Sequence, residues 1–239
     1  MGRLIGGLLD NNSTFGKIMT RLGIIIGANL MFVLFSLPVV TIGPGMTALH
    51  YCMLKCLHED SAINPFKTFW AGFKTNLKQA LICSLAAGAI AVILAVDIRF
   101  CSSQGGIFNI FKFACCALLL FLMIEMIYLM PVMACFEDTI PHLLRNALFF
   151  ASRRPLKMLL AAAIHIVPVV VTVIDTYLRP LYGFLWTVCG FGLIAMMMAE
   201  LLIKDFEEFL PKTEEEEQVT EVPSKTRRVI LKEMKKLDQ

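Results

Sequence analysis

Charged residues are scarce in this sequence, in which Asp, Glu, Lys and Arg make up only 17% of 239 residues. Hydrophobic residues make up 57%, against roughly 45–50% in an ordinary soluble domain. This balance excludes a typical water-soluble globular protein. The formal net charge is only +3, and since the positive residues gather in a few connecting segments, we expect no nucleic-acid partner.

The sequence also lacks the short motifs that usually accompany catalysis. It contains no Gly-x-Ser-x-Gly nucleophile elbow, no His-Glu-x-x-His zinc motif and no Gly-x4-Gly-Lys-Ser/Thr phosphate loop. We therefore expect that the protein is not an enzyme, with no catalytic residue and no cofactor.

Clusters of metal ligands are nearly absent as well. The segment His50-x-Cys52-x3-Cys56-x-His58 has residue types that zinc accepts. On a helix Cys52 and Cys56 share one face, but the two histidines point elsewhere, so one straight helix cannot gather all four. We expect no metal site.

Long apolar runs dominate what the sequence does contain. A hydrocarbon core roughly 30 Å thick needs about 20 apolar residues per helical crossing. Runs close to this length occupy residues 22–40, 81–96, 113–134, 158–174 and 181–203. The fold class that they predict is all-α, a polytopic membrane helix bundle with about five transmembrane helices and amphipathic cytoplasmic connecting helices. The expected domains are an N-terminal interfacial segment at 1–21, the bundle at 22–203 and a charged cytoplasmic tail at 204–239.

Basic residues in the connections predict the orientation, because Lys and Arg in short loops are retained in the cytoplasm. They are frequent in the first and third connections and in the C-terminal tail, and the two connections contain Lys55, Lys67, Lys74, Lys78, Arg145, Arg153, Arg154 and Lys157. We expect the N-terminus outside and the C-terminus in the cytoplasm, although Arg3, Lys17 and Arg21 weakly favour the opposite. No small-residue cleavage site follows the first run, which we interpret as an uncleaved anchor.

The first cytoplasmic connection contains an amphipathic pattern that begins at Asn64-Pro65. Aromatic residues recur at helical spacing along one side, and lysines line an adjacent stripe. Such a helix suits the lipid interface, the underside of its own bundle or the groove of a partner protein. The predicted partner-docking residues are Phe66, Phe69, Trp70, Phe73 and Lys74.

A turn rich in proline and glycine ends the first apolar run. Pro38 removes a helix donor, and Gly43-Pro44-Gly45 disfavours helix continuation, so the next helix is predicted to begin at Met46. The turn either redirects the chain or exposes backbone amides that bind a partner or ligand. Its signature residues are Pro38, Thr41, Gly43, Pro44 and Gly45.

Two ionisable residues lie deep inside apolar runs. A charged and unpaired group there costs at least about 2.5–3.5 kcal/mol, so Glu125 and His165 are functional candidates. They lie at similar depths and could share a proton in a transport path. The alternative is a protonated Glu125 that bonds to a neighbouring helix for packing.

Two stretches raise the question of an internal repeat. WAGFKTNLK from Trp70 aligns with FFASRRPLK from Phe149, and LPVV at Leu37 has a looser counterpart in MPVM at Met130. A real match would indicate a parallel repeat about an axis along the membrane normal, as some transporters have. A chance match is the alternative.

The segment NLMFVLFSLPVVTIGPGMTALHY, followed by FKTFWAGFKTNLKQA, resembles the YesL-like family of bacterial integral membrane proteins. This family is a domain of unknown function that is common in Gram-positive bacteria, and the resemblance is close over about residues 22–80. Its members accompany carbohydrate ABC importers and glycan-degrading enzymes, which implies a role near sugar uptake in the bacterial cell membrane. The resemblance supplies no binding or catalytic residues.

Two classes of function are consistent with these observations. The first is a non-catalytic integral membrane protein that acts as an auxiliary subunit or partner of a carbohydrate ABC importer. Its partners would be the lipid bilayer and the permease or ATPase subunits. The alternative is an independent small-molecule transporter or channel that uses Glu125 and His165.

Overall fold

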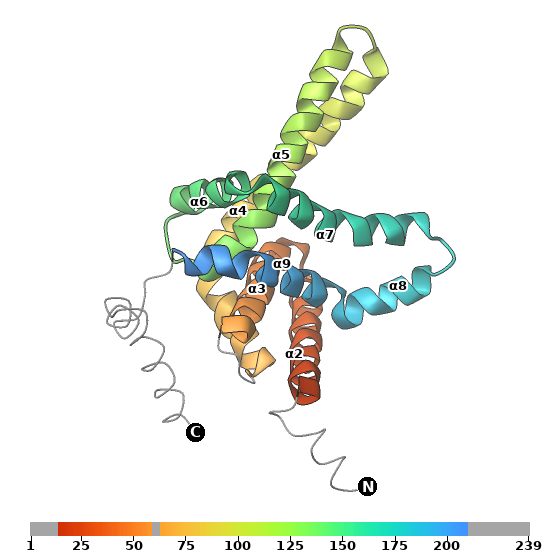
Figure 1. Ribbon diagram of the computed structural model, residues 1–239. Coiled ribbons are helices and arrows are strands. Elements are labelled where there is room, and N and C mark those ends of the chain that lie inside the picture. The colour runs from red at the N-terminus through yellow and green to blue at the C-terminus, as the bar shows by residue number, and fades with distance from the viewer. Residues whose placement is uncertain (1–13, 59–62, 210–239) are drawn as a thin grey trace, which may run out of the picture. The chain divides into compact units, whose positions relative to one another are not determined.

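The computed structural model describes residues 14–58 and 63–209, which are helical and contain no strand. The all-α prediction is confirmed. Figure 1 shows the helices α2 (Thr14–Phe35), α3 (Ile42–His58), α4 (Pro65–Gln104), α5 (Phe108–Cys135), α6 (Ile140–Arg153), α7 (Pro155–Ile174), α8 (Arg179–Leu185) and α9 (Phe191–Glu207), with a 3-10 turn, η1 (Val39–Thr41), and a π-helical turn, η2 (Trp186–Gly190). The chain divides into two compact units, Met1–Ile203 and Lys204–Gln239.

Five segments of the described chain are long and apolar enough to cross a membrane. They are Phe15–Phe35, Pro65–Gln104, Phe108–Cys135, Pro155–Ile174 and Arg179–Glu207. Each of them contains or overlaps one of the predicted apolar runs, so the protein is a multi-pass helical membrane protein. Residues 1–13 of the predicted interfacial segment and 210–239 of the predicted tail lie outside the described residues.

The first span lies earlier in the chain than the hydropathy predicts. Helix α2 already begins at Thr14, so the end of the predicted interfacial segment belongs to it, and it ends at Phe35 rather than at residue 40. The amide of Ser36 still bonds to the carbonyl oxygen of Phe32 at 2.9 Å. Pro38 has no amide hydrogen with which to continue this pattern, and so the helix stops just before it.

Helix α4 joins two elements that the sequence analysis treats as separate. The amphipathic connecting helix and the second span form one helix of 40 residues, Pro65–Gln104. Its start is as predicted, because Asn64 Oδ1 accepts hydrogen bonds from the amides of Phe66 and Lys67, both at 3.1 Å. Neither proline nor glycine interrupts the chain between the two predicted elements, and helix continuation is therefore the default.

A glycine pair closes the hairpin between α4 and α5. Gly105 and Gly106 have φ angles of +68° and +58°, which lie in the left-handed region that favours glycine. The two helices then run antiparallel and side by side (Figure 1).

The fifth span contains an irregular turn, whereas its hydropathy predicts a regular α-helix throughout. The π-helical turn η2 separates α8 from α9 and disturbs the regular bonding pattern of the backbone. Asn29 of α2 satisfies the groups at this turn. Its Nδ2 donates to the carbonyl oxygens of Trp186 at 3.1 Å and Thr187 at 2.7 Å, and its Oδ1 accepts from the amide of Gly192 at 2.8 Å.

The two repeat candidates have different backbones. Residues 70–78 lie inside α4, whereas residues 149–157 are interrupted at Arg154, between α6 and α7. Pro38 follows the end of α2, but Pro131 lies inside α5. The sequence similarity therefore does not mark a structural repeat.

Candidate functional site

The signature turn is held by the side chain of Thr41. Its hydroxyl oxygen lies 2.5 Å from the carbonyl oxygen of Phe35 and 2.6 Å from that of Pro38, so its one hydrogen can be donated to either, and its amide donates to the carbonyl oxygen of Pro38 at 2.8 Å. The end of α2 and the start of α3 are thereby joined through one residue. This arrangement supports the prediction that the segment redirects the chain.

The prediction that α3 begins at Met46 is wrong, because it begins at Ile42 and includes Gly43, Pro44 and Gly45. Proline is tolerated in the first turn of a helix, where its missing amide hydrogen has no partner to lose. The break in the chain therefore lies at residues 36–38, before the 3-10 turn, and not at the glycines.

The glycines of this turn allow close contact between helices. A Cβ atom at Gly43 would overlap the side chain of Ser84 and lie 3.1 Å from the carbonyl oxygen of Ala80 in α4. A Cβ at Gly45 would lie 3.1 Å from the ring of Phe32 in α2. Both glycines are buried, so they serve packing of α3 against its two neighbours.

The predicted docking residues divide between the interior and the surface. Phe69 and Phe73 are buried, with ring centroids 5.9 and 5.0 Å from that of Phe35 in α2. They pack inside their own chain and are not available to a partner in this structure. Phe66, Trp70 and Lys74 are exposed, and we call the surface formed by Phe66 and Trp70 the aromatic edge.

Trp70 is half-exposed but firmly supported. Its ring stacks on that of Phe73 at 6.0 Å with an interplanar angle of 14°, and it lies 5.6 Å from the ring of Phe35. About half of the Trp70 side chain, 50%, remains open to the surroundings. An indole that is held in this way can contact a partner with little loss of conformational freedom.

Glu125 and His165 do not meet in the structure. His165 Nδ1 lies 2.9 Å from the carbonyl oxygen of Ala161, one turn earlier in α7. Glu125 is 8% exposed, and its Oε2 has no hydrogen-bond partner among the described residues. The predicted proton-sharing pair is therefore not formed, and the packing alternative also lacks a bond at this oxygen.

An open cavity of about 960 Å³ lies where α3, α4, α5 and α7 meet the π-helical turn. Its lining is almost entirely apolar. The side chains with nitrogen atoms in this lining are His50 from α3, His165 from α7 and Trp186 from η2. The structure thus places His165 at the same cavity as His50, whereas Glu125 is not among the lining residues.

His50 is a site residue that the sequence analysis considers only as a metal ligand. It is 1% exposed, and its Nδ1 has no hydrogen-bond partner. Helix α3 is not among the five candidate spans. Burial, helped by the charge that His165 would have when protonated, lowers the pKa of His50 to about 3 and keeps it neutral. Gly43, Met46 and His50 recur at helical spacing in the sequence, and all three line the cavity. This spacing could have indicated that they share one face of a helix.

Trp186 is positioned by bonds to two other helices. Its Nε1 donates to Thr172 Oγ1 of α7 at 3.0 Å, while its carbonyl oxygen accepts from Asn29 of α2. The π-helical turn thereby presents an indole to the cavity. Such turns are frequently found at functional sites.

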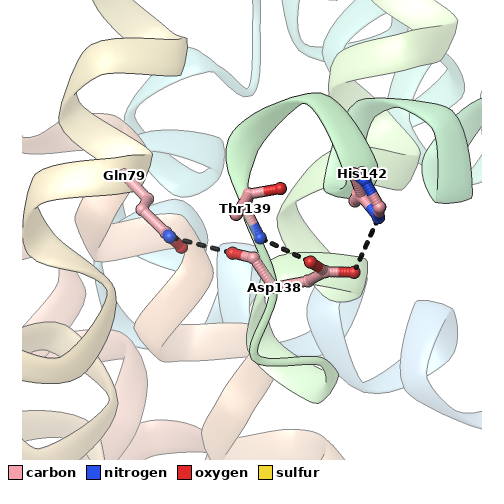
Figure 2. A network of polar contacts seen from close by, with 4 residues as sticks. All are labelled: Gln79, Asp138, Thr139 and His142. Atoms are coloured by element: carbon pink, nitrogen blue, oxygen red, sulfur yellow. Dashed lines mark hydrogen bonds and ion pairs between the residues drawn. The ribbon is translucent and has the colours of Figure 1, made fainter.

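A polar network connects α4 with the segment between α5 and α6. Figure 2 shows that Gln79 Nε2 donates to the carbonyl oxygen of Asp138 at 2.9 Å, and that the Asp138 carboxylate accepts from the amide of Thr139 at 2.7 Å. His142 Nδ1 lies 3.5 Å from Asp138 Oδ2. These groups are exposed, and a surface network of this kind contributes roughly 0–1 kcal/mol per pair. It braces the connection and shows no feature of a catalytic site.

The residues of the zinc-like segment do not converge. His58 is exposed, whereas His50, Cys52 and Cys56 are buried in α3. Within residues 14–58 and 63–209, no group of three or more His, Cys, Asp or Glu side chains lies close enough to hold a metal ion.

Comparison with known proteins identifies one region of similarity. A family model described as "Protein of unknown function, DUF624" matches residues 25–98. This range covers the second half of α2, the signature turn, α3 and most of α4. No curated protein and no solved structure matches the chain. The match is consistent with the resemblance to YesL-like proteins, and over residues 25–98 the chain is therefore similar to a family whose function is unknown.

Proposed function

We propose that this protein is a non-catalytic integral membrane protein that acts as an auxiliary subunit of a carbohydrate ABC importer. The observation that carries the docking role is the aromatic edge, where Trp70 is half-exposed yet fixed by buried rings of its own chain. Rigid, partly exposed tryptophans dominate the energy of many protein interfaces. The importer as partner rests on the sequence resemblance alone.

Charge next to the edge suits the same role. Lys67 and Lys74 are exposed on α4 beside Phe66 and Trp70. An apolar anchor with a basic rim fits a partner surface that offers an apolar pocket edged by carboxylates. The permease or the ATPase of an importer is the partner that we propose for this surface.

Copurification in mild detergent tests the proposal. The full-length chain, purified from its native membrane, should retain a carbohydrate importer's permease and ATPase in stoichiometric ratio, identified by mass spectrometry. The double variant Phe66→Ser/Trp70→Ser should lower this retention at least tenfold, because an interface hot spot contributes about 2 kcal/mol or more.

Phe111→Ser provides the matched control, because Phe111 is an exposed aromatic residue of α5 near the α4–α5 turn. This variant should retain the subunits as the unchanged protein does. Unchanged retention by the double variant, or importer subunits missing from the unchanged protein, would refute the proposal.

An independent transporter or channel is the second candidate, and the cavity beside His165 favours it. The lack of contact between Glu125 and His165 weighs against the shared-proton version of this idea. Flux of labelled small molecules into liposomes that contain only the purified protein would support the transporter, and Glu125→Gln should then abolish the flux. If Glu125→Gln leaves the flux unchanged, Glu125 has no part in it.

A further inference from the structure

The cavity combines an apolar wall with two imidazoles, those of His50 and His165, and Nδ1 of His50 has no hydrogen-bond partner. Its volume of about 960 Å³ is near the upper end of the roughly 300–1,000 Å³ typical of small-molecule sites. Leu, Ile, Val, Met and Ala side chains from four helices form most of the lining. A buried polar atom without a hydrogen-bond partner, such as Nδ1 of His50, is uncommon in folded proteins and needs an explanation.

The two imidazoles offer complementary hydrogen-bonding groups. A carbonyl oxygen can only accept, so the contact of His165 Nδ1 with the carbonyl oxygen of Ala161 requires the proton on Nδ1. In neutral His165 the other nitrogen, Nε2, is then an acceptor. Neutral His50 has one N–H donor and one acceptor, and its Nδ1 is unpartnered.

The lining also excludes several ligand classes. It contains no Lys or Arg, so a phosphate or carboxylate headgroup would lie there without a counter-charge, at a high cost. A sugar has many hydroxyl groups and would leave most of them unbonded. Trp186 Nε1 already donates to Thr172, and Ser84 Oγ already donates to the carbonyl oxygen of Leu81.

We propose that this cavity binds a lipid alcohol, meaning a long-chain lipid with one free hydroxyl group and no charge. The hydroxyl donates to Nε2 of His165 and accepts from the N–H group of His50. The hydrocarbon chain lies against the apolar side chains of α4, α5 and α7. A carbonyl-only headgroup would use His50 and leave His165 Nε2 unbonded, so the hydroxyl is the better match. Diacylglycerols and polyprenols share this chemistry.

Tryptophan fluorescence gives a direct test, because the chain has two tryptophans and Trp186 lines the cavity. In the full-length Trp70→Phe variant, Trp186 is the only tryptophan, so the indole fluorescence reports on the cavity. The probe is 9,10-dibromostearyl alcohol, whose bromine atoms quench nearby indoles, and the matched probe is its methyl ether, which cannot donate a hydrogen bond. We expect saturable quenching by the alcohol at a concentration about fivefold lower than by the ether, the ratio that one hydrogen bond typically gives.

Variants of the histidines complete the test. His165→Leu should remove the preference for the alcohol, because only the alcohol can donate to His165. His50→Leu should weaken both probes alike, because the ether oxygen can accept from His50 as the hydroxyl does. His142→Leu, at an exposed position, should change neither the affinity nor the preference. Should His50→Leu fail to fold, the half-buried His165 still decides the matter. Equal quenching by alcohol and ether, quenching that does not saturate, or an unchanged preference in His165→Leu would overturn the proposal.

Competition identifies the source of the ligand. Dioleoylglycerol and a polyprenol are added separately against the bound probe, and the one that displaces it at the lower concentration is the closer relative of the native ligand. If neither displaces the probe, a lipid alcohol is not the ligand. The outcome is independent of importer copurification, so the two proposals can fail separately.

Discussion

Asn29 shows how much one polar side chain can determine in an apolar bundle. It is fully buried, and its amide satisfies three backbone groups of the fifth span from a position in the first. An irregular turn of a membrane helix is stabilised where protein groups bond to its backbone, because the hydrocarbon core offers no water to do so. Asn29 therefore allows the π-helical turn and, through it, the placement of Trp186 at the cavity.

Asn29→Leu should destabilise the protein by about 3 kcal/mol, because several backbone groups lose their partner while the side-chain volume is nearly kept. Thermal unfolding of the purified protein in detergent, followed by circular dichroism, measures the change. Asn109→Leu alters an exposed asparagine of α5 and should leave the midpoint within a degree or two. Equal midpoints for both variants would contradict the structural role of Asn29.

At the scale of elements, α3 is the centre of the packing, since it contacts α2, α4 and α5. Small residues allow these close approaches, as helices in membranes associate through van der Waals contact rather than through a hydrophobic drive. Gly43 faces α4 and Gly45 faces α2. The Gly-Pro-Gly segment therefore lets the start of α3 pack closely against α2 and α4.

Gly43→Ala should lower the unfolding free energy by about 1–3 kcal/mol, because the added methyl group overlaps Ser84 and approaches backbone of α4. Gly23→Ala is the matched control, since a Cβ at Gly23 of α2 meets no atom within 4 Å. That control should be neutral or stabilising by up to about 1 kcal/mol. Denaturation midpoints of the two variants decide the point, and a Gly43→Ala protein as stable as Gly23→Ala would disprove the tight contact.

For the whole molecule, the length of α4 matters most. Forty residues extend about 60 Å, roughly twice the hydrocarbon core. Part of α4 must therefore leave the bilayer. Its first part contains exposed lysines and the aromatic edge, and its last part ends at the glycine turn before α5. From the positive-inside rule we propose that the first part lies in the cytoplasm and the glycine turn outside.

Cysteine labelling tests this orientation. In a background without reactive native cysteines, Ser103→Cys beside the glycine turn should react with a membrane-impermeant maleimide in intact cells. Lys67→Cys at the start of α4 should react only after permeabilisation. Both positions are exposed in the structure, so access to the reagent depends on the side of the membrane alone. The reverse pattern would invert the topology and remove the cytoplasmic docking surface.

The predicted docking residues show where sequence reasoning reaches its limit. Helical spacing correctly places Phe66, Phe69, Trp70 and Phe73 on neighbouring positions of one helix, and the Asn64-Pro65 start is confirmed. Spacing does not reveal that Phe35 of another helix covers Phe69 and Phe73 while Trp70 stays half-exposed. Which rings are buried depends on a partner helix, and that information is not local.

The sequence by itself determined the class of this protein and the number of its candidate spans. Each crossing must satisfy its own backbone and be apolar along its length, and both conditions are met by consecutive residues. Only the tertiary structure decided that Asn29 meets Trp186 across 157 positions of sequence, that His165 shares a cavity with His50 and not with Glu125, and that the glycines of α3 serve packing. These are contacts between distant segments, and helix packing, not local sequence, brings such segments together.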